Sequence, residues 1–142
     1  MKKRLLTSFL MLTLLLALLP TTALAAKNEI TVYNWGQYIS DGTDDSMDVI
    51  HEFEEETGIK VNYTTFDSNE SLYAKMKSGG ASYDVIFPSE YMVGKMASEG
   101  MLAELDLANI PNFAGIGEEY LGWDFDPDNK YSVPYTWGTT GL

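Results

Sequence analysis

Two short stretches of aromatic and hydroxyl residues have the side chains best suited to hold a small ligand. Trp35 and Tyr38 follow an apolar segment directly, and a Trp face attracts an ammonium group by about 0.5–2 kcal/mol. Both rings also pack well against methylene groups, so the pair suits a ligand in which amines alternate with carbons. Ser89 and Tyr91 follow a second apolar segment and add hydroxyl groups. These residues predict an aromatic and polar site for a cationic ligand.

Each of these residues also has a purely structural interpretation. Trp35 and Tyr38 could be core residues that close the end of a buried sheet. Ser89 follows a proline and precedes an expected helix, so its hydroxyl could act as a plain N-cap. For Ser89 the two roles are compatible, and the residues by themselves leave both interpretations open.

Other site chemistry finds little support in the sequence. His51, the only histidine, lies beside a run of glutamates on an expected helix, where a solvated helix face explains it. Asp124, Asp126 and Asp128 are spaced like the opening of a calcium loop. Asn129 stands where that loop needs glycine, so an Asx-type turn is the better interpretation. The chain has no cysteine, serine-nucleophile elbow, zinc-protease motif or phosphate loop. We therefore expect no metal, no cofactor and no enzymatic activity.

The apolar pattern predicts strands and helices in alternation. The expected strands are 30–33, 59–65 and 83–87, and the last is a continuous apolar run typical of a strand covered on both faces. The expected helices begin at 43–45, 68–69 and 88–89, and they end at glycines 58, 79–80 and 100. A short helix is expected near 118–121, and a tight turn at 127–129 is expected to lead into a last aromatic strand.

This alternation implies an α/β fold with a parallel sheet and helices on its faces. In such sheets ligands bind beyond the carboxyl ends of the strands. The rule selects the loop at 34–38, after the first strand, and the loop at 88–91, after the third strand. Both loops contain the aromatic and hydroxyl residues described above. The expected site therefore lies at the carboxyl edge of the sheet.

Residues 1–25 have the features of a secretory signal peptide. Basic residues at 2–4 precede an apolar run at 5–19, which is shorter than the ~20 residues that a spanning helix needs. Ala23 and Ala25 fit a signal-peptidase site, so we expect cleavage after Ala25 and a mature chain of 26–142. Because no cysteine follows the apolar run, we expect a periplasmic protein without a lipid anchor.

The chain is strongly acidic, with a formal net charge of −12. Loss of the three basic residues of the signal peptide would leave about −15 on the mature part. Nucleic acid is a poor partner for such a surface, because phosphate binding depends on Lys and Arg. The acidity suits attraction of a cationic ligand, but it could equally serve solubility alone.

Six stretches of the chain, taken together, resemble the polyamine-binding members of the bacterial extracellular solute-binding proteins, the spermidine/putrescine-binding components of ABC importers. The stretches are Tyr33–Tyr38, Phe53–Val61, Asp67–Met76, Tyr83–Ser89, Lys95–Met101 and Tyr131–Thr140. They follow in order across nearly all of the expected mature chain. Glu-Thr-Gly-Ile-Lys-Val is common to many solute-binding proteins, whereas Tyr-Asn-Trp, Ser-Asn-Glu-x-x-Tyr-Ala-Lys and Pro-Tyr-x-Trp-Gly are more specific.

The resemblance implies a periplasmic binding protein-like fold of type II, in which two α/β lobes joined at a hinge close on the ligand. The segment Pro134–Gly141 resembles the strand that crosses into the second lobe. The chain is therefore expected to hold a signal peptide at 1–25 and the N-terminal lobe at 26–142, truncated at the hinge strand. In the family the carboxylates that grip the inner amines come mainly from the second lobe, so this part alone is expected to bind ligand poorly.

The resemblance also assigns roles to site residues. It implies that Trp35 and Tyr38 sandwich the polyamine and that Ser89 and Tyr91 lie near a terminal amine. Two positions depart from the family. Gly36 stands where members often carry a hydroxyl residue, and Gln37, counted here as a ligand-binding residue, stands where some members have an acidic one.

The expected function is therefore polyamine binding and delivery of spermidine or putrescine to an inner-membrane ABC permease, by a monomer. A binding protein for another cationic amine, an amino-acid derivative or a sugar is the alternative. An exported carboxylate-based hydrolase is less favoured, and it would place a pair of Asp or Glu residues where the aromatic residues are expected.

Overall fold

A computed structural model describes residues 28–138 of the chain. The expected signal peptide and its cleavage site lie outside these residues, as do positions 139–142 of the last expected strand. None of the helices found between residues 28 and 138 combines the length and the apolar character that crossing a membrane requires.

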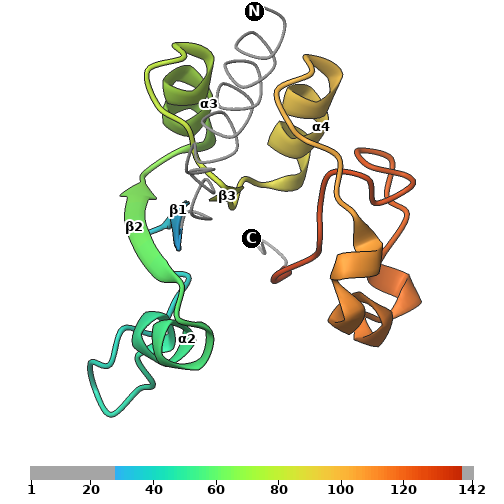
Figure 1. The fold of residues 1–142 in the computed structure, drawn as a ribbon. Coiled ribbons are helices and arrows are strands. Elements are labelled where there is room, and N and C mark those ends of the chain that lie inside the picture. Colours follow the sequence, from blue (N-terminus) through green and yellow to red (C-terminus); the bar gives the residue numbers. More distant parts are fainter. Residues whose placement is uncertain (1–27, 139–142) are drawn as a thin grey trace, which may run out of the picture.

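Three parallel strands form the sheet: β1 at Glu29–Trp35, β2 at Lys60–Phe66 and β3 at Val85–Ile86. β1 lies in the middle, in the order β2-β1-β3. Each strand is followed by a helix: α2 at Val49–Thr57, α3 at Asn69–Lys77 and α4 at Glu90–Ser98. The structure thus confirms the α/β alternation and the parallel sheet expected from the sequence (Figure 1).

The helices lie on opposite faces of this sheet. From β1 the chain moves to β2, the neighbour on one side. From β2 it then moves back past β1 to β3, the neighbour on the other side. Because parallel crossovers are right-handed, α2 and α3 must cover opposite faces. Figure 1 shows α3 and α4 together on one side and α2 on the other. The sheet thus has an α3–α4 side and an α2 side.

The core lies on the α3–α4 side. Tyr33 of β1 and Phe66 of β2 share one face of the sheet, because the strands pair Tyr33 with Thr64 and Trp35 with Phe66. There they pack against Leu72 of α3 and the two methionines Met92 and Met96 of α4, all of them buried. The Tyr33 and Phe66 rings meet edge to face with centroids 5.0 Å apart, a favourable aromatic geometry.

Several boundaries differ from the sequence expectations. β1 runs on through Asn34 and Trp35, so Trp35 ends the strand instead of starting a loop. α2 begins only at Val49, capped by Asp48, because Asp44 and Asp45 have positive φ angles that a helix cannot contain. The two predictions for these regions were wrong by a few residues.

The third strand and the segment after it also need correction. β3 is only two residues long, and Val85 is 42% exposed, so the strand is not covered on both faces. Residues 131–138 are expected to form a strand, but none of them is in one. Within the described part, this segment has no backbone pairing with a strand. Side-chain contacts of Tyr135 and Trp137 hold it instead. The helix expected near 118–121 is a single 3-10 turn, η3 at Glu118–Tyr120, after η1 at Leu107–Asn109 and η2 at Pro111–Gly115.

The turn after Asp126 is a β-turn, closed by a hydrogen bond from the Asn129 amide to the Asp126 backbone carbonyl at 3.0 Å. The Asx-type turn expected here is wrong, because the Asp126 side chain bonds to amides further along the chain. Asp126 is 4% exposed, and its carboxylate accepts hydrogen bonds from the backbone amides of Lys130, Tyr131 and Ser132 at 2.9–3.0 Å. It also accepts from the Ser132 hydroxyl at 2.8 Å. The carboxylate oxygens are therefore committed to holding the segment that follows the turn.

Candidate ligand-binding site

All three strands end at the same edge of the sheet, because they are parallel. The five residues predicted to bind ligand lie on or just after the ends of β1 and β3. The structure does not gather them into one cluster. It divides them into an aromatic group, which holds Trp35, Gln37 and Tyr38, and a polar group, which holds Ser89 and Tyr91.

In the aromatic group, Trp35 packs against the core, which is the structural role that the sequence left open. Its ring is half-buried and lies 4.5 Å, centroid to centroid, from the core ring of Phe66. Its other neighbour is Tyr38, at 6.0 Å. Tyr38 is 45% exposed, so its ring is open to a ligand while Trp35 supports it from the core.

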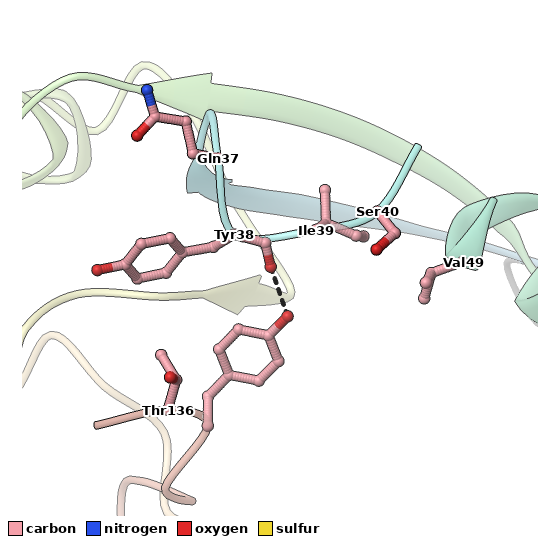
Figure 2. A pocket seen from close by; sticks show the side chains of 7 residues that line it. Gln37, Tyr38, Ile39, Ser40, Val49 and Thr136 are labelled. Carbon is pink, nitrogen blue, oxygen red and sulfur yellow. Dashed lines mark hydrogen bonds between the residues drawn. The ribbon is translucent and has the colours of Figure 1, made fainter. Parts of the chain in front are cut away.

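Beside Tyr38 the α2 side opens into a hollow of about 510 Å³. It is lined by Gln37, Tyr38, Ile39, Ser40, Val49, Tyr135 and Thr136 (Figure 2). Its walls thus come from the loop after β1, from the first residue of α2 and from a segment nearly a hundred residues further along the chain.

Tyr135 is one of five lining residues that the sequence did not predict for the site, and it makes the most contacts at this edge. The other four are Ile39, Ser40, Val49 and Thr136. The Tyr135 hydroxyl donates a hydrogen bond to the backbone carbonyl of Tyr38, drawn as a dashed line in Figure 2. Its ring meets Phe87, just after β3, edge-on with centroids 4.9 Å apart. Tyr135 therefore ties the ends of β1 and β3 together. The signal was present in the Pro-Tyr-x-Trp-Gly stretch, which was interpreted only as a connecting strand.

The polar group lies where α3 and α4 begin. Ser89 occupies the N-cap position of α4, but its hydroxyl makes no capping hydrogen bond. The plain N-cap interpretation is therefore wrong for the side chain. Instead, the Ser89 hydroxyl accepts from the Asn69 side-chain amide at 3.0 Å, and the Ser89 backbone amide donates to Asn69 Oδ1, also at 3.0 Å.

Tyr91 has a partner of its own in the same place. Its hydroxyl donates to a carboxylate oxygen of Glu70 at 3.0 Å, and its ring is 52% exposed. Desolvation raises the pKa of Tyr91, a hydrogen bond with the Asn69 side chain offsets part of this rise, and the carboxylates of Glu70 and Glu90 raise the pKa further. Tyr91 therefore stays protonated, and the two carboxylates give this end of the site a negative potential. Glu70 and Asn69 were not predicted as site residues.

The side chains considered as metal ligands do not belong to either group. His51 lies on the exposed face of α2 with its Nε2 3.4 Å from a carboxylate oxygen of Glu55, as expected of a solvated helix face. Among residues 28–138 no three His, Asp or Glu side chains come together in a way that could hold a metal ion. The described site offers rings, hydroxyls and carboxylates, which are the groups that surround an organic cation.

A small parallel α/β layer with aromatic and polar side chains at the carboxyl edge of its strands has the architecture of a small-molecule binding lobe. Residues 35–142 match the family described as bacterial extracellular solute-binding protein. The chain belongs to this family, as the resemblance predicted.

Individual relatives agree with this assignment. The spermidine/putrescine-binding periplasmic protein of Salmonella typhimurium is 43% identical over 129 residues, which cover 89% of this chain and 35% of the relative. A putrescine-binding periplasmic protein of Escherichia coli is 36% identical over 130 residues, 90% of this chain and 34% of the relative.

The fold agrees as well. The crystal structure of a spermidine/putrescine ABC transporter substrate-binding protein from Streptococcus pneumoniae matches with a TM-score of 0.70 and 48% identity, over 75% of this chain and 31% of that one. This match confirms the α/β fold of the periplasmic binding protein type. The chain spans about a third of the length of the curated relatives that it matches.

Proposed function

We propose that the protein binds a polyamine, spermidine or putrescine, and delivers it to an ABC importer of the inner membrane. The observation that carries the proposal is the composition of the carboxyl edge. The exposed ring of Tyr38, backed by Trp35, lies on one part of this edge, and the Ser89 and Tyr91 hydroxyls with the Glu70 carboxylate lie on another. The names of the curated relatives point to the same ligand class.

The two groups match the two needs of a polyamine. Each protonated amine loses water on binding, and hydrogen-bond acceptors or carboxylates must replace that water. The methylene segments between amines need an apolar surface, and an aromatic face satisfies both the methylenes and a neighbouring ammonium. Gln37 adds a neutral amide at the mouth of the hollow, so it supplies an acceptor without a charge.

Export and partners belong to the same proposal. The signal-like residues 1–25 and the absence of cysteine support a periplasmic, unanchored protein that acts as a monomer on its permease. The relatives named above are periplasmic proteins. The protein acts as a receptor without enzymatic activity, with the remaining ligand contacts supplied by a second lobe that closes over this edge.

Gly36 stands where the family often has a hydroxyl residue, and lack of space does not explain the glycine. A Cβ atom built on Gly36 would meet no atom within 4 Å. A hydroxyl side chain would therefore fit there, and its absence leaves one hydrogen bond fewer for a ligand. We propose that this position lowers the affinity for the polyamine without changing the ligand class.

The test is calorimetric titration of spermidine and putrescine into the protein as its gene encodes it, including any coding sequence after Leu142. We expect saturable one-to-one binding. Tyr38→Ala should weaken it about 2- to 30-fold, the range of one cation–π contact. Trp123→Ala removes another exposed ring, one that does not line the hollow, and it should leave binding unchanged. A folded protein that gives no heat with either polyamine would overturn the proposal, and amino-acid derivatives and sugars would then be titrated.

A further inference from the structure

Two side chains at the start of α3 hold two side chains at the start of α4. Asn69, the first residue of α3, bonds to Ser89, and Glu70, the second, accepts from Tyr91. Asn69 is 5% exposed, so it is almost fully enclosed, whereas Tyr91 is open to solvent. The Asn69 pair is therefore the more rigid of the two links, and it fixes the residue predicted to contact a terminal amine.

The direction of each hydrogen bond in the Asn69 pair follows from chemistry. The Ser89 backbone amide can only donate, so the atom facing it must be the carbonyl oxygen of the Asn69 side chain. The amide nitrogen of Asn69 must then face the Ser89 hydroxyl. Because that nitrogen can only donate, the Ser89 oxygen accepts from it, and the hydroxyl proton points away from Asn69.

This arrangement leaves the Ser89 hydroxyl fixed in place and only partly used. A hydroxyl oxygen has two lone pairs, and Asn69 takes one of them. The hydroxyl does not cap α4, and the amides of Met92 and Val93 bond to the Ser89 backbone carbonyl instead. Among residues 28–138, one lone pair of this rigidly held oxygen therefore remains without a donor. An ammonium group, which can only donate, needs such an acceptor.

We propose that Asn69 is a positioning residue of the amine site, which holds the Ser89 hydroxyl so that its free lone pair accepts a hydrogen bond from a ligand ammonium group. This role rests on the proposed function. In this proposal Asn69 itself touches no ligand. Its side chain acts mainly through Ser89, and it also faces the Tyr91 hydroxyl.

A double-mutant cycle tests this role through spermidine affinity measured by calorimetry. Asn69→Ala should weaken binding about tenfold, the loss expected of one charge-assisted hydrogen bond, and Ser89→Ala should do the same. In the Ser89→Ala background, Asn69→Ala should cause little further loss, because the group that it positions is already absent. Asn112→Ala, a change at an exposed asparagine of η2, should leave affinity unchanged.

Asn69→Asp gives a second readout that a structural role alone would not produce. A carboxylate can accept from both the Ser89 amide and the Ser89 hydroxyl, so the hydroxyl proton turns inward and both lone pairs of the oxygen face outward. Spermidine affinity should therefore stay at or above that of the unmodified protein. Asn112→Asp adds the same charge elsewhere, and it measures the general attraction that must be subtracted.

The possible results separate this inference from the proposed function. If the unmodified protein binds no polyamine, the proposed function is overturned and the role of Asn69 with it. If polyamine binds but the Asn69→Ala and Ser89→Ala effects add fully, only the positioning role is overturned. The same conclusion follows if Asn69→Asp loses as much affinity as Asn69→Ala. Urea unfolding of each variant, compared with its affinity, shows whether a loss of binding merely follows a loss of folding.

Discussion

The two sides of the sheet differ in how firmly they are packed. On the α3–α4 side, Leu72 and Met96 are 0% exposed, and each of the two helices contributes buried residues. On the α2 side, the helix has no buried residue at all, and Phe53 and Val49 remain 37% and 41% exposed. The hollow beside Tyr38 opens next to Val49 on this looser side.

This difference separates the two groups of the candidate site. The polar group lies at the start of the two well-packed helices, where hydrogen bonds between side chains fix Ser89 and Tyr91. The aromatic group borders the looser side, where Tyr38 is held chiefly through its backbone carbonyl by Tyr135. For the proposed polyamine ligand, we infer that the fixed polar end positions a terminal amine and that the less tightly packed aromatic wall contacts the methylene chain.

The largest effect should come from the core of the α3–α4 side. Leu72→Ala should lower the free energy of unfolding by about 2–5 kcal/mol, because it removes buried methyl groups and leaves a cavity. Phe53→Ala removes more atoms but from a side chain that is 37% exposed, so its cost should be about 1–2 kcal/mol. Equilibrium urea unfolding measures both values. Equal costs would show that α2 packs as tightly as α3, and the contrast between the two sides would be wrong.

A smaller effect should distinguish the two helix caps. Ser68 caps α3 by accepting from the Ser71 amide at 3.1 Å, and Asp48 caps α2 by accepting from the His51 amide at 3.0 Å. Ser68→Ala should lower global stability by about 1 kcal/mol, because α3 must stay folded to keep its core residues buried. Asp48→Ala should mainly loosen α2 itself, since little buried surface depends on that helix.

Amide hydrogen exchange combined with urea unfolding can separate these outcomes. The Asp48→Ala variant should exchange faster within residues 49–57 while its global unfolding changes less than that of Ser68→Ala. A uniform rise in exchange across both sides after Asp48→Ala would mean that α2 and the core unfold as one unit.

The sequence predicted the fold where periodicity and capping chemistry agree. Ser68 at the start of α3 is confirmed, because its hydroxyl accepts a hydrogen bond from a helix amide. Gly58 at the end of α2 is confirmed as well, because glycine tolerates the left-handed φ of 68° found there. The start of α2 was missed because the turn at Asp44 and Asp45 also has the residue types of an N-cap. The length of β3 depends on pairing, which local pattern does not encode.

For the candidate site, the sequence predicted that its residues lie at the carboxyl edge of the sheet, where the structure places them, but it did not predict how they are arranged. Trp35 and Tyr38 could be named because they follow a strand. Asn69 looked like an ordinary helix start, and its link to Ser89, twenty positions away, exists only once α3 and α4 lie side by side. Tyr135 meets Tyr38 across ninety-seven positions for the same kind of reason. Contacts of this range depend on the tertiary fold and have no local signal.

The smallest effect should be a pH dependence confined to the α3–α4 side. Hydrogen bonds from Lys77, Lys95 and Tyr73 to the Glu99 carboxylate lower the pKa of Glu99 from 4.5 to about 2, with Lys77 the largest contributor. Because the folded pKa lies below the unfolded one, the stabilisation is fully present above pH 4.5 and is lost as the pH falls toward about 2. The Glu99 side chain is 28% exposed, so salt should screen the effect.

Glu99→Gln tests this dependence, with Glu55→Gln on the α2 side as the matched control. The free energy of unfolding is measured in urea between about pH 6 and pH 2. At about pH 6 it should be lower for Glu99→Gln than for the unmodified protein, and at about pH 2 the two values should converge. Within the part of the chain that the structure describes, the ion pair of Glu55 is with His51, and both side chains are more than 60% exposed. Replacement of Glu55 should therefore change stability little at any pH. A difference in the free energy of unfolding that stays constant with pH would contradict this prediction. It would mean that Glu99 stabilises the fold without its charge, because the protonated side chain would stabilise it as well as the carboxylate does.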